Sequence, residues 1–171
     1  MQEKVHVSGG TALSDQDFHS GEIFMTEDSL DCAFAWDTGV AINRYLTELK
    51  NGRIIATECR HCNRIMLPPR LFCELCFIPS NNWVYVHDTG IVNTFSICYV
   101  HWDASRIKEG EKPYLPALIE IDGASTGMGI MHLLGEVEPE KIKFGMKVKA
   151  VWKPENERTG SITDIKYFKP I

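Results

Sequence analysis

The sequence predicts a mainly β protein with a short N-terminal helical segment, in which a rubredoxin-like zinc ribbon is followed by an OB-fold β-barrel. Two Cys-x2-Cys pairs are separated by ten residues, an amphipathic stretch precedes them, and five or six short β-like segments follow. We expect an arm over residues 1–36, a helix over 37–52, the ribbon over 53–82 and the barrel over 83–171.

The helix is predicted from a change in apolar spacing after the arm. Residues 1–36 show only short apolar patches between Gly-Gly and Ser-Gly pairs, so we expect little core of their own. From there, Asp37 or Thr38 can cap a helix through a side-chain oxygen. An apolar stripe at helical spacing follows, formed by Ile42, Tyr45, Leu46 and Leu49. Asn51-Gly52 is a pair suited to the left-handed end of a helix.

The four ribbon cysteines form the strongest motif in the chain. They are Cys59, Cys62, Cys73 and Cys76. Each Cys-x2-Cys pair directs two sulfur atoms from a tight turn toward one ion, and two such turns supply the tetrahedron that zinc accepts. Four thiolates leave no open coordination position, so we predict a structural ion. Iron is the chief rival, because this ligand set alone does not exclude it.

The segments around and after the cysteines read as strands. Residues 53–57 and 64–67 belong to the ribbon, and Pro68-Pro69 reverses the chain. Further strands are predicted at 83–87, 91–100, 115–121, 129–134, 147–152 and 161–168. This number of short strands favours a small closed barrel of the OB type. Lys147 and Lys149 alternate with apolar residues, which is typical of the wet face of an edge strand.

Charge and composition limit the classes of function. Acidic residues outnumber basic ones, 23 to 18, and the formal net charge is −5. A nucleic-acid-binding module usually carries a basic footprint, so this alternative is disfavoured. No stretch of about 18 apolar residues is present, and residues 1–10 lack the pattern of a secretory signal. We therefore expect no membrane partner and a cytoplasmic location with reduced thiols.

The order of motifs resembles a known family. The helix is followed by three ribbon motifs and two barrel motifs: Cys59-Arg60-His61-Cys62, Leu67-Pro68-Pro69-Arg70, Phe72-Cys73-Glu74-Leu75-Cys76, Asp88-Thr89-Gly90-Ile91-Val92 and Gly145-Met146-Lys147-Val148. Over about residues 36–171 the chain resembles the OB-fold, zinc-ribbon proteins associated with acyl-CoA enzymes. The resemblance implies a non-catalytic accessory subunit of a thiolase or thiolase-like enzyme. The partner subunit would cleave the carbon–carbon bond.

The same resemblance implies a zinc cofactor at the four cysteines and an acyl-CoA bound at the interface with the thiolase-type subunit. Family members accompany archaeal acetoacetyl-CoA thiolase, benzoylsuccinyl-CoA thiolase and steroid side-chain aldolases; of these, the benzoylsuccinyl-CoA enzyme is our specific hypothesis. Guanidinium groups match phosphate oxygens, so Arg60, Arg64 and Arg70 are candidates for CoA binding or for ion pairs with a partner. Trp102 is a candidate apolar anchor. Two alternatives stay open: a single-stranded nucleic-acid-binding module and a rubredoxin-like iron electron carrier.

Overall fold

A computed structural model describes residues 14–21, 37–101, 103–108 and 110–171. The chain divides into two compact units, residues 1–36 and 37–171. Within the first unit, the described part forms the short helix α1 (Asp15–His19), which the sequence pattern did not predict. Ser14 caps this helix and exchanges hydrogen bonds with Asp17.

Helix α2 (Gly39–Lys50) confirms the predicted helix in the second unit. The carboxylate of Asp37 accepts a hydrogen bond from the Gly39 N–H (2.8 Å), and Gly52 has the left-handed backbone (φ 71°) expected at the C-terminal end. The buried stripe, however, consists of Ala41, Tyr45 and Leu49, while Ile42 is exposed. The predicted stripe is therefore wrong at its first position. A helix places residues four apart on one face, and Ala41 fits that face in register with Tyr45 and Leu49.

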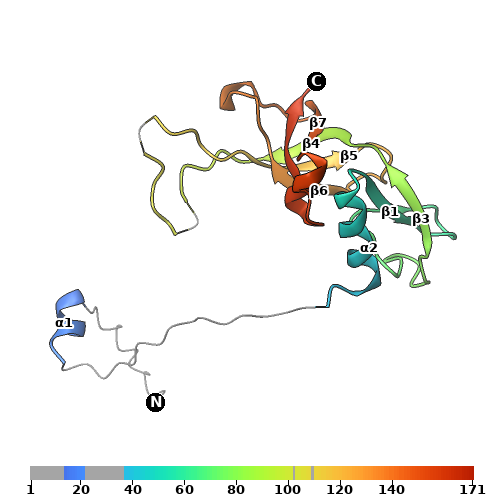
Figure 1. Cartoon of the computed structure of the whole chain (residues 1–171), viewed down its shortest axis with the longest axis horizontal. Helices are drawn as coiled ribbons and strands as arrows, with labels where there is room; N and C mark the ends of the chain where they lie inside the picture. The colour runs from blue at the N-terminus through green and yellow to red at the C-terminus, as the bar shows by residue number, and fades with distance from the viewer. Residues whose placement is uncertain (1–13, 22–36, 102, 109) are drawn as a thin grey trace, which may run out of the picture. The chain divides into compact units, whose positions relative to one another are not determined.

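The ribbon is built on a three-stranded antiparallel sheet with the order β2-β1-β3. Its strands are β1 (Ile54–Glu58), β2 (Ile65–Met66) and β3 (Asn82–Val86). The first four residues of β1 are fully buried, which makes it the central core strand. All five residues of β1 pair with β3, so the strand that we expected to open the barrel is hydrogen-bonded to the ribbon. In Figure 1, α2 lies beside this sheet.

A second, five-stranded antiparallel sheet has the order β6-β5-β4-β7-β8. Its strands are β4 (Thr89–Phe95), β5 (Pro116–Ile121), β6 (Gly129–Leu133), β7 (Lys147–Trp152) and β8 (Ile165–Pro170). Three short 3₁₀ turns connect parts of it, at Pro139–Lys141, Glu155–Glu157 and Ile162–Asp164. The core is filled by inward-facing residues that include Val92, Ile119, Val148 and Phe168.

Two details of this sheet differ from the expectation. The outer strands β6 and β8 approach each other through a single parallel bridge, Leu134 to Phe168, so the sheet is not closed by a continuous ladder. Lys147 and Lys149 are exposed and alternate with buried Val148, as predicted, but β7 lies between β4 and β8 and is not an edge strand. Strand order depends on long-range pairing, which the alternation of one strand does not encode.

A long hairpin-like loop joins β4 to β5. β4 ends at Phe95, five residues before the end of the predicted strand, and isolated bridges join Cys98 to Tyr114 and Val100 to Arg106. In Figure 1 this loop extends away from the five-stranded sheet (yellow-green). The ribbon and the larger sheet are also joined by backbone contacts, because Ile65 donates to the Ser125 hydroxyl (2.8 Å) and accepts from its N–H (3.0 Å). No helix in the described part of the chain is long and apolar enough to cross a membrane.

Candidate metal centre

Two turns of the same design present the four cysteines. In the first, Cys59 donates its N–H to the carbonyl of Arg64 (2.9 Å) and accepts from the N–H of Asn63 (2.8 Å). In the second, Cys73 donates to Ile78 (3.0 Å) and accepts from Phe77 (2.9 Å). In each turn the residue four positions after the first cysteine has a left-handed backbone. Its φ is 57° at Asn63 and 54° at Phe77.

The four sulfur atoms of Cys59, Cys62, Cys73 and Cys76 all lie within 4.8 Å of one another. A tetrahedral zinc ion with Zn–S bonds of about 2.3 Å requires sulfur–sulfur distances of about 3.8 Å. The distance between the sulfur atoms of Cys62 and Cys73 is 3.7 Å. The cage therefore fits a tetrahedral metal ion with four sulfur ligands, and the structure brings together all four residues that the sequence singled out.

The thiols of the cage influence one another's protonation. The backbone N–H of Cys62 holds the pKa of Cys59 at about 6. The side-chain contact with Cys62, together with burial, raises the pKa of Cys76 to about 12. Four thiolates at this separation repel one another, so the fully deprotonated set needs a cation at its centre.

Contacts around the cage fix its supporting loops. His61 Nδ1 lies 3.4 Å from the sulfur of Cys76, and so links the first turn to the second. The fully buried hydroxyl of Thr57 on β1 donates to the carbonyl of Arg70 and accepts from its N–H, both at 2.9 Å. These bonds tie the loop that enters the second turn to the central strand. Sequence analysis missed Thr57, because no local pattern marks the distant backbone that its hydroxyl binds.

The arginines predicted to bind CoA or a partner surround the cage, but two of them share an internal carboxylate. Arg64 donates to Glu74 (2.7 Å), and Arg70 lies 3.4 Å from the other oxygen of the same carboxylate. The N–H of Glu74 itself and these two guanidinium groups lower the pKa of its carboxyl group. Arg60 is exposed on the first turn. Trp102 lies outside the described residues.

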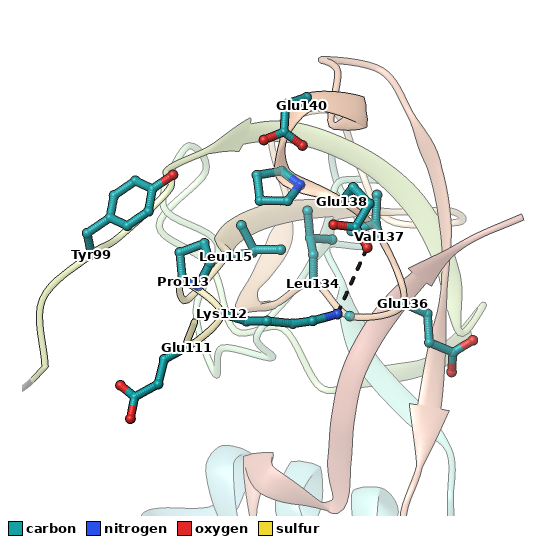
Figure 2. A pocket seen from close by; sticks show the side chains of 12 residues that line it. Tyr99, Glu111, Lys112, Pro113, Leu115, Leu134, Glu136, Val137, Glu138 and Glu140 are labelled. Carbon is teal, nitrogen blue, oxygen red and sulfur yellow. Dashed lines mark ion pairs between the residues drawn. The ribbon is translucent and has the colours of Figure 1, made fainter. Parts of the chain in front are cut away.

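A cavity with a volume of about 390 Å³ is separate from the cage. It lies between the β4–β5 loop and the segment after β6, and Figure 2 shows its lining side chains. Four glutamates contribute to that lining: Glu111, Glu136, Glu138 and Glu140. Lys112 of the lining lies 3.9 Å from Glu138, and Glu136 pairs with Lys169 from outside the lining (3.2 Å). An acidic wall of this kind is unsuited to the phosphates of a nucleotide or of CoA.

Two family models match this chain. Residues 47–80 match the rubredoxin-like zinc ribbon domain of ChsH2, and residues 83–153 match the C-terminal OB-fold domain of ChsH2. The match to a zinc ribbon agrees with the sulfur cage, and the match to an OB-fold agrees with the five-stranded sheet.

Two curated relatives share part of this sequence. A DUF35 domain-containing scaffold protein of Methanocaldococcus jannaschii is 30% identical over 121 residues, which cover 69% of this chain and 82% of the relative. A protein of Thermomonospora curvata described as a probable enoyl-CoA hydratase alpha subunit is 28% identical over 116 residues, covering 66% of this chain. The chain matches only 34% of the length of that second relative.

Two solved structures share the fold. A DUF35-family protein of unknown function from Sulfolobus solfataricus aligns with a TM-score of 0.60 and 24% identity, covering 78% of this chain and 87% of that one. An Ltp2-ChsH2(DUF35) aldolase aligns with a TM-score of 0.55 and 23% identity, covering 81% and 98%. From the two family models and the M. jannaschii relative, this chain belongs to the DUF35 family and carries the zinc-ribbon and OB-fold domains of ChsH2.

Proposed function

We propose that this chain is a non-catalytic accessory subunit of a thiolase-type acyl-CoA enzyme complex, with one structural zinc ion at Cys59, Cys62, Cys73 and Cys76. The closed cage of four sulfur atoms carries this proposal. A catalytic zinc keeps a position for water or substrate, whereas four thiolates fill the tetrahedron. The ion then stabilises a small module and fixes the side chains on its surface.

The remaining thiol of the described part supports the same conclusion. Cys98 lies in the β4–β5 loop, and its sulfur donates to the backbone carbonyl of Val100 at 3.4 Å. A catalytic cysteine needs a neighbouring base or cation that activates it, and a backbone carbonyl is neither. The nucleophile for carbon–carbon cleavage is therefore assigned to the partner subunit.

One relative supports an association with acyl-CoA chemistry, and the others support a role beside a partner protein. One is described as a scaffold protein, one as a subunit of an enoyl-CoA hydratase, and one solved structure pairs ChsH2 with Ltp2 in an aldolase. We further propose that the partner enzyme is of the thiolase type, with benzoylsuccinyl-CoA as one candidate substrate. For the CoA phosphates, the exposed guanidinium group of Arg60 on the ribbon is the best candidate among the predicted arginines, because Arg64 and Arg70 already pair with Glu74.

The test is a comparison of the isolated chain with its complex. The zinc-loaded chain is purified alone, and also with whichever enzyme accompanies it from its native cell, which is identified by mass spectrometry. Both samples are assayed for thiolysis of a 3-oxoacyl-CoA with free CoA. We expect turnover only in the complex. Turnover by the isolated chain would refute the accessory role, and a hydratase or aldolase in place of a thiolase would refute the thiolase step alone.

A further inference from the structure

The second cysteine turn carries exposed apolar side chains that no described part of the chain covers. Four large apolar residues stand within the seven residues around it and are 41–84% exposed: Leu71, Phe72, Leu75 and Phe77. Isolated exposed apolar residues are ordinary, but several on one tight turn mark an interaction site. We call this set the apolar knuckle.

The first cysteine turn serves as an internal comparison. Both turns have the same hydrogen bonds and the same left-handed residue, yet the first has Asn63 at that position and the second has Phe77. Asparagine adopts this conformation readily, whereas a bulky side chain does so at a cost in free energy. Phe77 is also 84% exposed, so burial against residues that the structure describes does not offset that cost. The fold alone would be served better by asparagine or glycine at position 77.

The knuckle is held rigidly in place. The sulfur cage fixes Cys73 and Cys76 on either side of Leu75, and the bonds from Thr57 to the backbone of Arg70 fix the loop that leads into the turn. A surface that is ordered before binding loses little conformational freedom when a partner covers it.

We propose, building on the accessory role, that the apolar knuckle is the surface by which this chain docks on its acyl-CoA enzyme, in an apolar pocket edged by carboxylates. The charges around the knuckle favour an enzyme surface that carries carboxylates. Two arginines, Arg64 and Arg70, lie beside the knuckle and share the single carboxylate of Glu74, which leaves one positive charge in excess there, in a chain whose formal net charge is −5. Exposed aromatic residues with neighbouring arginines are the composition of interface hot spots. A second copy of the chain fits less well, since two-fold pairing would place arginines opposite arginines.

The test uses the enzyme that accompanies the chain from its native cell, separated and then recombined with variants in isothermal titration calorimetry. Phe77→Asn gives the second turn the residue of the first. We expect it to keep its zinc, to melt at or above the temperature of the wild type, and to bind the enzyme about thirtyfold more weakly, the scale of a hot spot. Met131→Asn is the matched control, since Met131 is 75% exposed on β6, and its binding should stay within about twofold of the wild type.

Each other result has a distinct meaning. If the wild type binds and Phe77→Asn binds equally well, the docking proposal is overturned while the accessory role stands. A wild-type chain that does not bind the enzyme would overturn the accessory role itself. The docking proposal is also overturned if sedimentation shows a wild-type dimer that Phe77→Asn converts to a monomer. Hydrogen exchange on the complex should protect residues 71–77 and leave residues 129–133 unchanged.

Discussion

Thr57→Val tests how the ribbon holds the loop that leads into the second cysteine turn. The threonine is fully buried in the central strand β1. Its hydroxyl makes two hydrogen bonds of 2.9 Å, one to the N–H and one to the carbonyl of Arg70. Valine has the same shape without the hydroxyl, so the substitution removes both bonds and leaves the packing nearly unchanged.

The expected loss follows from the two hydrogen bonds that the buried hydroxyl makes. Arg70 is exposed, so its backbone groups can turn to water, and each bond is counted at its net value of about 1 kcal/mol, which gives about 2 kcal/mol in the free energy of unfolding. For a chain of this size, that loss corresponds to a fall of roughly 4–8 °C in melting temperature. Release of the metal to a chelator should also become faster, because the loop that positions Cys73 is no longer tied to β1.

The assay is urea unfolding followed by circular dichroism, with zinc held at saturation for every variant. Thr47→Val is the matched control, since Thr47 is exposed on α2 and its hydroxyl bonds only within the helix, to the Asn43 carbonyl. A change of less than about 0.5 kcal/mol is expected there. If Thr57→Val were as small in effect as Thr47→Val, the two bonds would not anchor the loop and our account of the ribbon's rigidity would be wrong.

Two further substitutions test the metal site and the acid sensitivity of the fold. Cys73→Ser removes one of the four ligands, so the variant should no longer bind one equivalent of zinc and its ribbon should lose ordered structure. Elemental analysis that still finds one equivalent of zinc would contradict this. Asp164 is buried, and although burial raises its pKa, hydrogen bonds from the N–H groups of Thr159, Ser161 and Gly160 outweigh it and lower the pKa below its usual value. Its stabilising contribution is therefore present above about pH 4 and is lost as the pH falls through the lowered pKa. Asp164→Asn should lose about 1–3 kcal/mol at pH 7 and much of this acid dependence, which urea unfolding between pH 7 and 3 measures; an unaltered acid dependence would count against it.

The sequence predicted correctly those parts of the fold that depend on residues close together in the chain. Helix α2 follows from its apolar spacing and from the Asn51-Gly52 end, and the metal cage follows from two cysteine pairs whose spacing leaves few other uses. The apolar stripe was misplaced at Ile42 because a small residue, Ala41, occupies the buried position. Alanine is so small and so weakly apolar that it does not stand out in a search for apolar spacing.

Features that depend on contacts between distant parts of the chain could not be predicted from the sequence. The pairing of β3 with β1 and the interior place of β7 depend on register between distant strands. Nothing near Thr57 indicates that its hydroxyl binds the backbone of a residue thirteen positions away. By contrast, the buried carboxylate of Asp164 had a readable signal, because Ser161 and Asp164 have capping-box spacing. The left-handed position of Phe77 could likewise have been found by aligning the two cysteine turns with each other.

X-ray absorption at the metal edge, on the purified chain, tests directly whether the four sulfur atoms fill the coordination shell of the ion. We expect zinc with a single shell of four sulfur atoms at about 2.3 Å, from Cys59, Cys62, Cys73 and Cys76. The same spectrum identifies the element, so iron would point to the electron-carrier alternative. A shell of three sulfur atoms with one oxygen or nitrogen would show an open position on the ion, and the account of a non-catalytic scaffold would be contradicted.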